Sequence, residues 1–345
     1  MKRRFEECFS YSNTQGSNHL RQAISGLFID NIRVSADSIL ITNGSQQAIS
    51  LIAQTLIRPN DNVLVDHTSY LGIEKPLKDS RARIQSFPKP LHELSYSGIE
   101  KVIKYVQPKI LYVIPDFANP TGQSLTGELR TFLAEFAERY RFFLVEDRSY
   151  SCLAYPYNPL LPSLLSLSSD TLSIGSISKC IAPGLRIGWI ASAQINNINK
   201  LVLQKETVDL GSSMLVQEIS ASILEELRKS PKLMDTIKAF YQRRMELLLS
   251  SLEKYMPEDF SWTIPHGGFF VWVNGPKSLD SRSFFQRALL NGVGFTPGCL
   301  FYYKKPQNNT FRLSISDVPD TDIEEGVKRL AKAASEELSQ IHHSS

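Results

Sequence analysis

The sequence predicts an α/β protein: a mainly parallel β-sheet flanked by helices, followed by a smaller α+β domain. Two observations lead to this prediction. From about residue 20 to about residue 210, short apolar runs rich in β-strand formers alternate with longer helical segments, which is the pattern of β-α-β units. After residue 211, long amphipathic segments and two further strand signals follow.

The expected strands of the first part are residues 38–42, 62–66, 110–116, 142–147, 171–177 and 188–192. Helices fit between several of them, for example 46–56 and 127–140. Right-handed crossovers would bring the carboxyl ends of parallel strands to one edge, where open α/β sheets bind ligands. We therefore expect functional side chains just after these strands.

In the second part, the expected helices are 215–227, 234–255 and 322–338, and the expected strands are 267–274 and 311–316. The predicted division of the chain is an N-terminal segment over 1–30, a large ligand-binding domain over 31–210 and a small α+β domain over 211–345.

Charge and composition exclude several classes of function. The chain has 38 Lys and Arg against 35 Asp and Glu, without long blocks of one sign, so no nucleic-acid partner is predicted. No apolar stretch approaches the ~18–20 residues that span a bilayer, and no signal peptide is recognised. The four cysteines are scattered, which indicates neither a disulfide framework nor a metal site and favours the cytoplasm.

The strongest local signal surrounds Lys179, just past the strand expected at 171–177. Ser176 and Ser178 precede this lysine, and Arg186 follows a Pro-Gly pair. A lysine at a strand end beside hydroxyls and an arginine suits an amine that forms a Schiff base next to a bound phosphate. A solvent-facing charge on a loop is the better interpretation of any single lysine; the whole string favours the functional one.

A second signal lies where the strand 38–42 meets the following helix. Gly44, Ser45 and Gln46 stand at this corner, where free backbone N–H groups and the helix dipole favour an anion. A serine N-cap explains the same residues at least as well when they are considered alone.

Two more strand ends carry polar side chains. Asn119 precedes a proline after the strand 110–116, so its amide could donate toward a ring oxygen, although Asn-Pro-Thr-Gly is also ordinary turn chemistry. Asp147, at the end of strand 142–147, could pair with a pyridinium nitrogen, with Tyr150 three residues later. A loop-capping aspartate with a core tyrosine is the alternative.

Together these motifs resemble the pyridoxal-5′-phosphate (PLP) dependent fold-type I aminotransferases of class I/II. The resemblance is greatest to the branch of kynurenine and 2-aminoadipate aminotransferases and the cofactor domains of MocR-type regulators. Residues 176–188 match S-x-S-K-x-x-x-P-G-L-R-x-G at every fixed position. The resemblance covers about Tyr11 to about Leu338 and implies PLP as cofactor, a seven-stranded type of sheet and no metal.

It also implies roles for single residues. Lys179 would hold PLP as a Schiff base, and Asp147 would face the ring nitrogen. The phosphate would be held by Gly44, Ser45, Gln46, Ser176, Ser178 and Arg186. Asn119 and Tyr150 would contact the ring oxygen, and Tyr70 would stack on the ring, so that Lys179, Asp147 and Tyr70 form the expected catalytic set.

Arg312 and Asn119 are expected to bind the substrate carboxylate, and Tyr11 to reach the cofactor phosphate of a neighbouring subunit in a homodimer. The resembled branch usually has an acidic residue and a proline between the Asp and the Tyr, where this chain has Arg148 and Ser149. We expect Arg148 to face solvent, with substrate contact as the alternative. Relatives usually have some tens of residues before the Tyr11 segment; here ten precede it.

The predicted function is transfer of an amino group between an amino acid and a 2-oxo acid. One alternative is another PLP reaction, such as decarboxylation, elimination or a biosynthetic tailoring step, because the same cofactor serves all of these. The other is a non-catalytic PLP and effector sensor. Regulators of that kind carry an N-terminal DNA-binding domain, for which the ten residues before Tyr11 leave no room.

Overall fold

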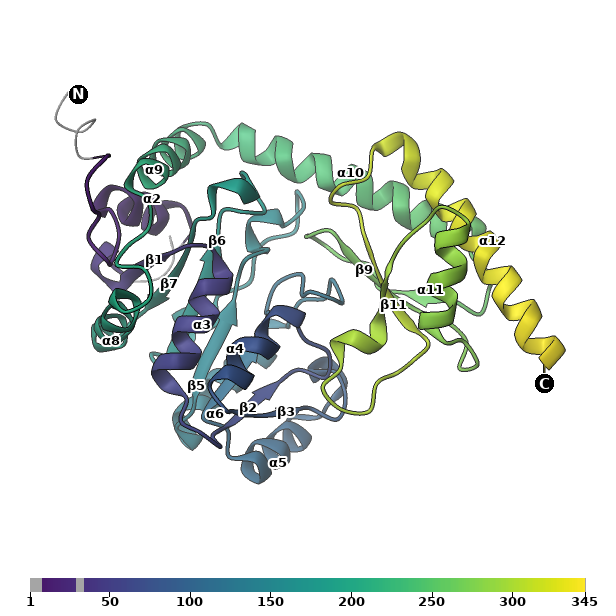
Figure 1. The fold of residues 1–345 in the computed structure, drawn as a ribbon, viewed down its shortest axis with the longest axis horizontal. Coiled ribbons are helices and arrows are strands. Elements are labelled where there is room, and N and C mark those ends of the chain that lie inside the picture. Colours follow the sequence, from purple (N-terminus) through teal and green to yellow (C-terminus); the bar gives the residue numbers. More distant parts are fainter. Residues whose placement is uncertain (1–7, 29–33, 345) are drawn as a thin grey trace.

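The computed structural model describes residues 8–28 and 34–344 of the 345-residue chain. Residues 1–7 and 29–30 of the expected N-terminal segment, and residues 31–33 of the expected large domain, lie outside these ranges. Two parts, each with its own sheet, lie side by side, and helix α10 (Pro231–Tyr255) runs from one to the other (Figure 1).

The first sheet has seven strands. In sheet order they are β1 (Ile39–Thr42), β7 (Gly188–Ser192), β6 (Thr171–Ser176), β5 (Phe143–Asp147), β4 (Ile110–Val113), β2 (Asn62–Val65) and β3 (Arg83–Ser86). All are parallel except β7, which runs antiparallel to both β1 and β6. The carboxyl ends of the parallel strands and the start of β7 therefore meet at one edge.

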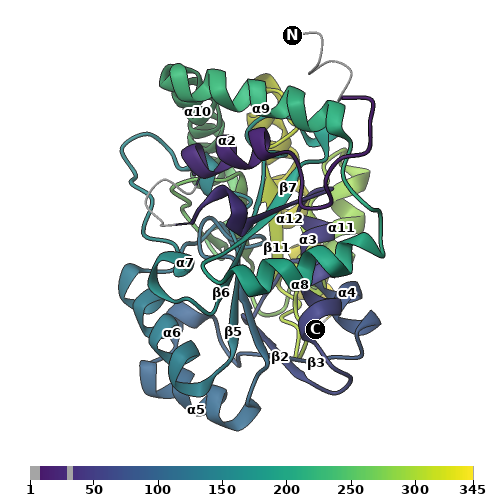
Figure 2. The same cartoon turned by 90° about the vertical axis from the view of Figure 1, so that its left-hand side faces the viewer.

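Helices cover both faces of this sheet (Figure 2). One face carries α3 (Ser45–Leu56), α4 (Glu74–Asp79) and α8 (Ile195–Glu206), and the other carries α5 (Tyr96–Val106), α6 (Gly127–Tyr140) and α7 (Leu164–Leu167). Side chains of successive strand residues point to opposite faces. Leu111 and Leu144 accordingly join the core under α5 and α6, whereas Tyr112 and Val145 join the main core on the other face.

The second sheet has four antiparallel strands in the order β10 (Thr296–Pro297), β11 (Thr310–Ser314), β9 (Phe270–Asn274) and β8 (Ser261–Trp262). Helices α10, α11 (Ser281–Leu290) and α12 (Asp320–Ser344) pack together beside it. Short 3₁₀ turns complete the elements: Ala36–Ser38, Leu71–Ile73, Leu91–Glu93, Ser151–Leu153, Pro183–Leu185 and Gly298–Phe301.

The structure confirms the predicted α/β class and every strand that the sequence indicated, within a few residues. Strand β3 was not predicted, because it is an edge strand with a single apolar residue, Ile84. The division of the chain after residue 210 stays a prediction. Helix α9 (Met214–Lys229), which follows that point, packs on α2 (Asn18–Phe28).

Backbone contacts join the two parts at two places. Thr68 forms an isolated antiparallel bridge with Tyr302, and Ser69 N–H donates to the carbonyl of Phe301 at 3.0 Å. A second bridge pairs Ala154 with Gly267. These contacts hold the loop after β2 and the loop after β5 against the second part. Both loops therefore border the space between the two parts.

Candidate active site

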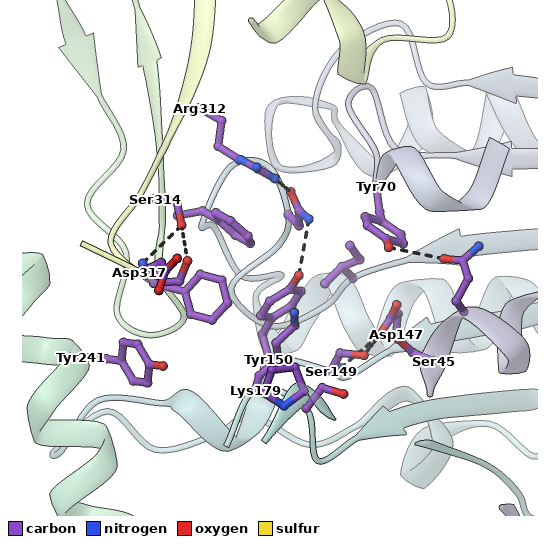
Figure 3. Close-up of a pocket in the computed structure, with 18 of the residues that line it drawn as sticks. Ser45, Tyr70, Asp147, Ser149, Tyr150, Lys179, Tyr241, Arg312, Ser314 and Asp317 are labelled. Atoms are coloured by element: carbon purple, nitrogen blue, oxygen red, sulfur yellow. Dashed lines mark hydrogen bonds between the residues drawn. The ribbon is translucent and has the colours of Figure 1, made fainter. Parts of the chain in front are cut away.

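A cavity of about 690 Å³ lies between the two parts, at the edge where the parallel strands end. Figure 3 shows Ser45, Tyr70 and Asp147 on one side of it and Tyr241 on the opposite side, with Lys179 between. The predicted residues on its wall are Ser45, Gln46, Tyr70, Asn119, Asp147, Tyr150, Ser178, Lys179, Arg186 and Arg312. These side chains come from segments far apart in the sequence, and most of them follow the ends of strands.

Lys179 follows β6 and is half-buried. Its Nζ lies 6.0 Å from the ring centroid of Tyr150 and 5.9 Å from that of Phe269. Burial, assisted by the nearby cations of Arg186 and Arg312, lowers the pKa of Lys179 against the opposing influence of Asp147. A larger fraction of neutral amine is available at a given pH, as a nucleophile or proton acceptor requires.

Asp147 ends β5 and is 3% exposed. One oxygen, Oδ1, accepts from Ser149 N at 3.0 Å and from Ser149 Oγ at 2.5 Å, and the other, Oδ2, accepts from Tyr112 Oη at 3.0 Å. Burial raises the pKa of Asp147, although these bonds and the charge of Lys179 act in the opposite direction. The carboxylate lies in a nonpolar setting beside neutral donors, which favours binding a cation.

Arg312, Asn119 and Tyr150 form a hydrogen-bonded chain across the cavity. Arg312 Nη1 donates to Asn119 Oδ1 at 2.7 Å, and Asn119 Nδ2 donates to Tyr150 Oη at 3.4 Å. The guanidinium lies 4.3 Å from the ring centroid of Phe270, and its Nε is buried without a hydrogen-bond partner among the described residues. An unsatisfied buried donor of this kind suits an incoming carboxylate.

The corner between β1 and α3 has the geometry of an anion site. Gly44 is the N-cap of α3 at φ 85° and makes no side-chain cap bond, and Ser45 is the first helical residue. The alternative of Ser45 as N-cap is therefore wrong. A Cβ on Gly44 would lie 2.6 Å from Arg186 Nη2, so glycine lets the guanidinium approach the free N–H groups of the helix.

Two predicted phosphate-binding residues lie off the cavity wall. Ser176 is buried, and its hydroxyl oxygen lies 3.0 Å from the carbonyl oxygen of Ile187 and 3.0 Å from Ser178 Oγ. Gly44 directly precedes Ser45 and is not among the residues that line the cavity. Ser176 thus contacts Ser178, which itself lines the cavity.

Tyr70 and Gln46 contact each other at the cavity wall. Tyr70 Oη donates to Gln46 Oε1 at 3.4 Å, while Gln46 Nε2 donates to the carbonyl of Gly72 at 2.6 Å. The side chain of Gln46 is engaged by the loop that carries Tyr70. Its backbone N–H, in the first turn of α3, is free of an intrahelical partner and can face an anion.

The expectation that Arg148 faces solvent is wrong. Its Nε donates to Asp116 Oδ2 and to Ser151 Oγ, both at 3.2 Å, and the side chain is 14% exposed. Asp116 also accepts from Arg130 Nη2 at 2.5 Å. The sequence alone does not indicate Asp116 as its partner, because the two residues are 32 positions apart.

Several wall residues were missed by sequence reasoning. Ser149 replaces an expected proline, and its contact with Asp147 follows from the turn after β5. Tyr241 lies on α10, and Phe269 and Phe270 lie at the start of β9. Tyr112, which donates to Asp147, lies behind this wall on β4, where it pairs with Val145 of β5. The alternation of side chains along the strands was the one sequence signal that could have placed Tyr112 on the same face of the sheet as Val145.

A comparison with protein families shows to which family the chain belongs. The family model described as aminotransferase class I and II matches residues 2–330. The chain belongs to this family. It is a PLP-dependent aminotransferase, as the motifs indicated.

Individual relatives of this aminotransferase agree. An aromatic-amino-acid aminotransferase of Thermococcus litoralis is 35% identical over 350 residues, covering 96% of this chain and 81% of that protein. A solved kynurenine aminotransferase of Pyrococcus horikoshii superposes with a TM-score of 0.91 at 32% identity, covering 98% and 85% of the two chains. An alpha-aminoadipate aminotransferase of Thermus thermophilus, complexed with N-(5′-phosphopyridoxyl)-L-leucine, gives 0.90 at 31% identity, covering 96% and 85%.

The residues present fit PLP. The anion corner, with Gly44 leaving room for Arg186, suits a phosphate. The buried Asp147 suits a ring nitrogen that carries a proton, and Lys179 lines the same cavity (Figure 3). The phosphate, the ring nitrogen and the aldehyde of the cofactor would thus each have a complementary group in the aminotransferase.

Tyr11 of the aminotransferase lies apart from this cavity. Its side chain is 95% exposed. Its neighbours are anchored, since Ser12 Oγ donates to the carbonyl of Ser212 at 2.9 Å and Thr14 Oγ1 to that of Leu210 at 2.6 Å. A large aromatic side chain is therefore presented to the exterior by a tethered segment.

Within residues 8–28 and 34–344, none of the helices combines the length and the apolar character needed to cross a bilayer.

Proposed function

We propose that Lys179 would hold PLP covalently through its Nζ and that its neutral amine accepts the proton that leaves the substrate Cα. The observation that carries this proposal is the position of the amine in the cavity, beside a buried carboxylate and an anion corner. The lowered pKa of Lys179, caused mainly by burial, favours the neutral amine that accepts a proton. PLP, when bound, supplies a conjugated ring that takes up the electron pair left on Cα.

The other groups orient the reactants. Arg312, whose Nε has no partner among the described residues, binds the substrate carboxylate with Asn119 beside it. Asp147 binds the protonated ring nitrogen, and Asn119 and Tyr150 contact the ring oxygen. Tyr70 packs on the ring face. Ser45, Gln46 N–H, Ser178 and Arg186 hold the phosphate, with Gly44 and Ser176 supporting them.

We propose an aromatic amino acid as the preferred amino donor. Phe269, Phe270 and Tyr241 line the cavity, with Tyr241 on the side away from Asp147 (Figure 3), and aromatic faces favour aromatic ligands. The relatives named as aromatic-amino-acid and kynurenine aminotransferases are consistent with this choice.

We also propose a homodimer in which Tyr11 contacts the cofactor phosphate of the partner subunit. The support is a large exposed side chain on a segment tethered by Ser12 and Thr14. A cytoplasmic location is proposed because Cys152, Cys180 and Cys299 form no disulfide within the described chain.

The decisive experiment adds a panel of amino acids to the purified PLP-loaded protein. The panel contains phenylalanine, tyrosine, kynurenine, 2-aminoadipate and alanine, and the absorbance of the cofactor and the 2-oxo acid product are followed. Formation of the 2-oxo acid with the aminated cofactor supports the proposal, fastest for the aromatic members. Release of carbon dioxide or ammonia, or binding without any product, contradicts it.

Lys179→Ala should abolish covalent attachment, measured by mass after borohydride reduction. Lys200→Ala is the matched control, since Lys200 lies exposed on α8. The proposed role of Lys179 would be contradicted if Lys179→Ala retained the added mass of the cofactor, or if the control variant lost it.

A further inference from the structure

Two side chains donate hydrogen bonds to the carboxylate of Asp147, and neither has a role in the function proposed above. Ser149 Oγ donates to Oδ1 at 2.5 Å, and Tyr112 Oη donates to Oδ2 at 3.0 Å. Both side chains are almost completely buried, with 3% of Ser149 and 1% of Tyr112 exposed. Ser149 also lines the cavity, next to Asp147 (Figure 3).

The hydrogen bonds divide unequally between the two oxygens. An ionised carboxylate offers about four lone-pair positions, about two on each oxygen. Oδ1 already accepts from both Ser149 N and Ser149 Oγ, whereas Oδ2 accepts from Tyr112 alone. The remaining acceptor position is therefore on Oδ2, and a cationic N–H in the cavity would bind there.

The same arrangement favours one protonation state. Burial raises the pKa of Asp147, so an unsupported carboxyl here would tend toward its neutral form. Tyr112 keeps its proton, because burial and the adjacent Asp147 raise its pKa well above its usual value. It can therefore remain a donor to Oδ2, and the Ser149 hydroxyl supplies a second side-chain donor that also favours the charged form.

We propose that the hydroxyls of Ser149 and Tyr112 are positioning groups that keep Asp147 ionised and direct its Oδ2 toward the protonated nitrogen of the cofactor ring. This inference rests on the proposed role of Asp147 and adds to it the residues on which that role depends. Neither hydroxyl takes part in the reaction itself. Their effect reaches the cofactor only through the carboxylate.

A purely structural role for Ser149 is the alternative. Its backbone N–H already bonds Oδ1 at 3.0 Å and could hold the turn after β5 without the hydroxyl. The two explanations differ in what the loss of the hydroxyl should affect. A structural role would weaken binding of any ligand of this shape, whereas the proposed role concerns only a ligand with a ring nitrogen.

The test compares two ligands on the cofactor-free protein: PLP, and its carbon analogue in which CH replaces the ring nitrogen. Both carry the aldehyde and the phosphate, so attachment to Lys179 is common to them. Equilibrium dialysis gives the dissociation constants for wild type and Ser149→Ala over a range of pH. We expect Ser149→Ala to bind PLP about tenfold more weakly and the analogue as tightly as wild type does.

The difference for PLP should widen as the pH falls, because Asp147 without the hydroxyl takes up a proton at a higher pH. Ser149→Thr, which keeps a hydroxyl, should recover most of the affinity. Equal losses for both ligands, or no loss for PLP, would overturn the proposal.

If Ser149→Ala does not fold, Tyr112→Phe tests the same carboxylate from its other oxygen. It should also discriminate between the two ligands, and equal affinities for wild type and Tyr112→Phe would contradict the proposal. The borohydride experiment on Lys179 tests the proposed function separately. If the wild type holds PLP on Lys179 while Ser149→Ala behaves as wild type, only the present inference fails.

Discussion

Two buried carboxylates at the ends of neighbouring strands, Asp116 after β4 and Asp147 in β5, are treated in opposite ways. Asp116 is 1% exposed and accepts hydrogen bonds from Arg130, Arg148 and Ser151. Burial by itself would raise the pKa of Asp116, but the two guanidinium groups lower it. Asp147 is 3% exposed and has neutral donors, and burial raises its pKa.

The difference separates a structural carboxylate from one available to a ligand. Asp116 has its counter-charges within the chain, and Arg130 also donates to the carbonyls of Pro115, Leu125, Leu161 and Pro162. This network holds the loop that leads to Asn119. Asp147 has no guanidinium among its hydrogen-bond partners in the described structure, so a bound cation can complete its environment.

The largest effect is expected from breaking the Asp116 network. Arg130→Met removes a fully buried cation and leaves Asp116 with Arg148 as its remaining cationic partner. We expect the free energy of unfolding to fall by about 3–5 kcal/mol, because a buried charge loses its main partner. Urea denaturation measures this change.

Arg139→Met, the same substitution on the exposed side of α6, is the control. If both variants lose similar stability, or if neither does, Asp116 and Arg130 are not the structural pair described above.

Asp147→Asn should have the opposite effects to Arg130→Met: activity should fall, and the free energy of unfolding should not. The amide oxygen can accept both Ser149 donors and the amide nitrogen can donate to Tyr112, whose hydroxyl also accepts. The ring nitrogen loses its counter-charge, so kcat/KM should fall about 10²-fold to 10³-fold. Steady-state assays and thermal unfolding of the cofactor-free protein give the two readouts; normal activity in this variant would refute the role of Asp147.

The pH dependence of stability should report the raised pKa of Asp147. The folded pKa of Asp147 is raised above its usual value of 3.8, so its ionisation opposes folding and the associated stability is lost as the pH rises through the folded pKa. The free energy of unfolding of Asp147→Asn should therefore increase relative to that of wild type as the pH rises. Unfolding of both cofactor-free proteins from about pH 4 to about pH 8 measures this difference in unfolding free energy. A difference that shifts in favour of wild type as the pH rises would contradict a raised pKa for Asp147.

Arg148→Gln should have a smaller effect on the Asp116 network than Arg130→Met. Arg130 remains as a partner of Asp116, and the side chain of Arg148 is 14% exposed. A loss of about 2 kcal/mol in unfolding free energy is expected for one charged hydrogen bond. A loss equal to that of Arg130→Met would mean that the two arginines act as one unit.

The smallest effect should come from a surface pair. Lys75 and Asp79 lie 2.9 Å apart on α4, with side chains 84% and 60% exposed. Asp79→Asn should leave the urea midpoint unchanged within error, since water screens exposed pairs. A measurable loss would show that burial alone does not explain the contrast between Asp116 and other acids.

The parts of the site that the sequence predicted are those encoded locally. The corner at Gly44 and Ser45, the string around Lys179 and the strand end at Asp147 each combine a strand signal with neighbouring polar residues. The parallel strands then bring these ends together without further information. The fold class was predictable for the same reason.

What the sequence did not reveal depends on register and on distant contacts. Tyr112 meets Asp147 because β4 and β5 are adjacent in the sheet, and Arg148 meets Asp116 across 32 positions. The departure from proline at Ser149 was visible in the sequence, but its hydrogen bond to Asp147 required the turn geometry. Strand β3 has too little apolar character to be recognised alone.

The reversed direction of β7 has a consequence for how the cofactor is held. Because β7 starts at the edge where β6 ends, the short connection between them contributes both Lys179 and Arg186 to the same rim. A parallel β7 would begin at the opposite edge, roughly 16 Å away for a five-residue strand, and would need a long crossover. The proposed covalent attachment of PLP to Lys179 and the proposed ionic contact of its phosphate with Arg186 thus depend on one short connection, and an insertion there should disturb both.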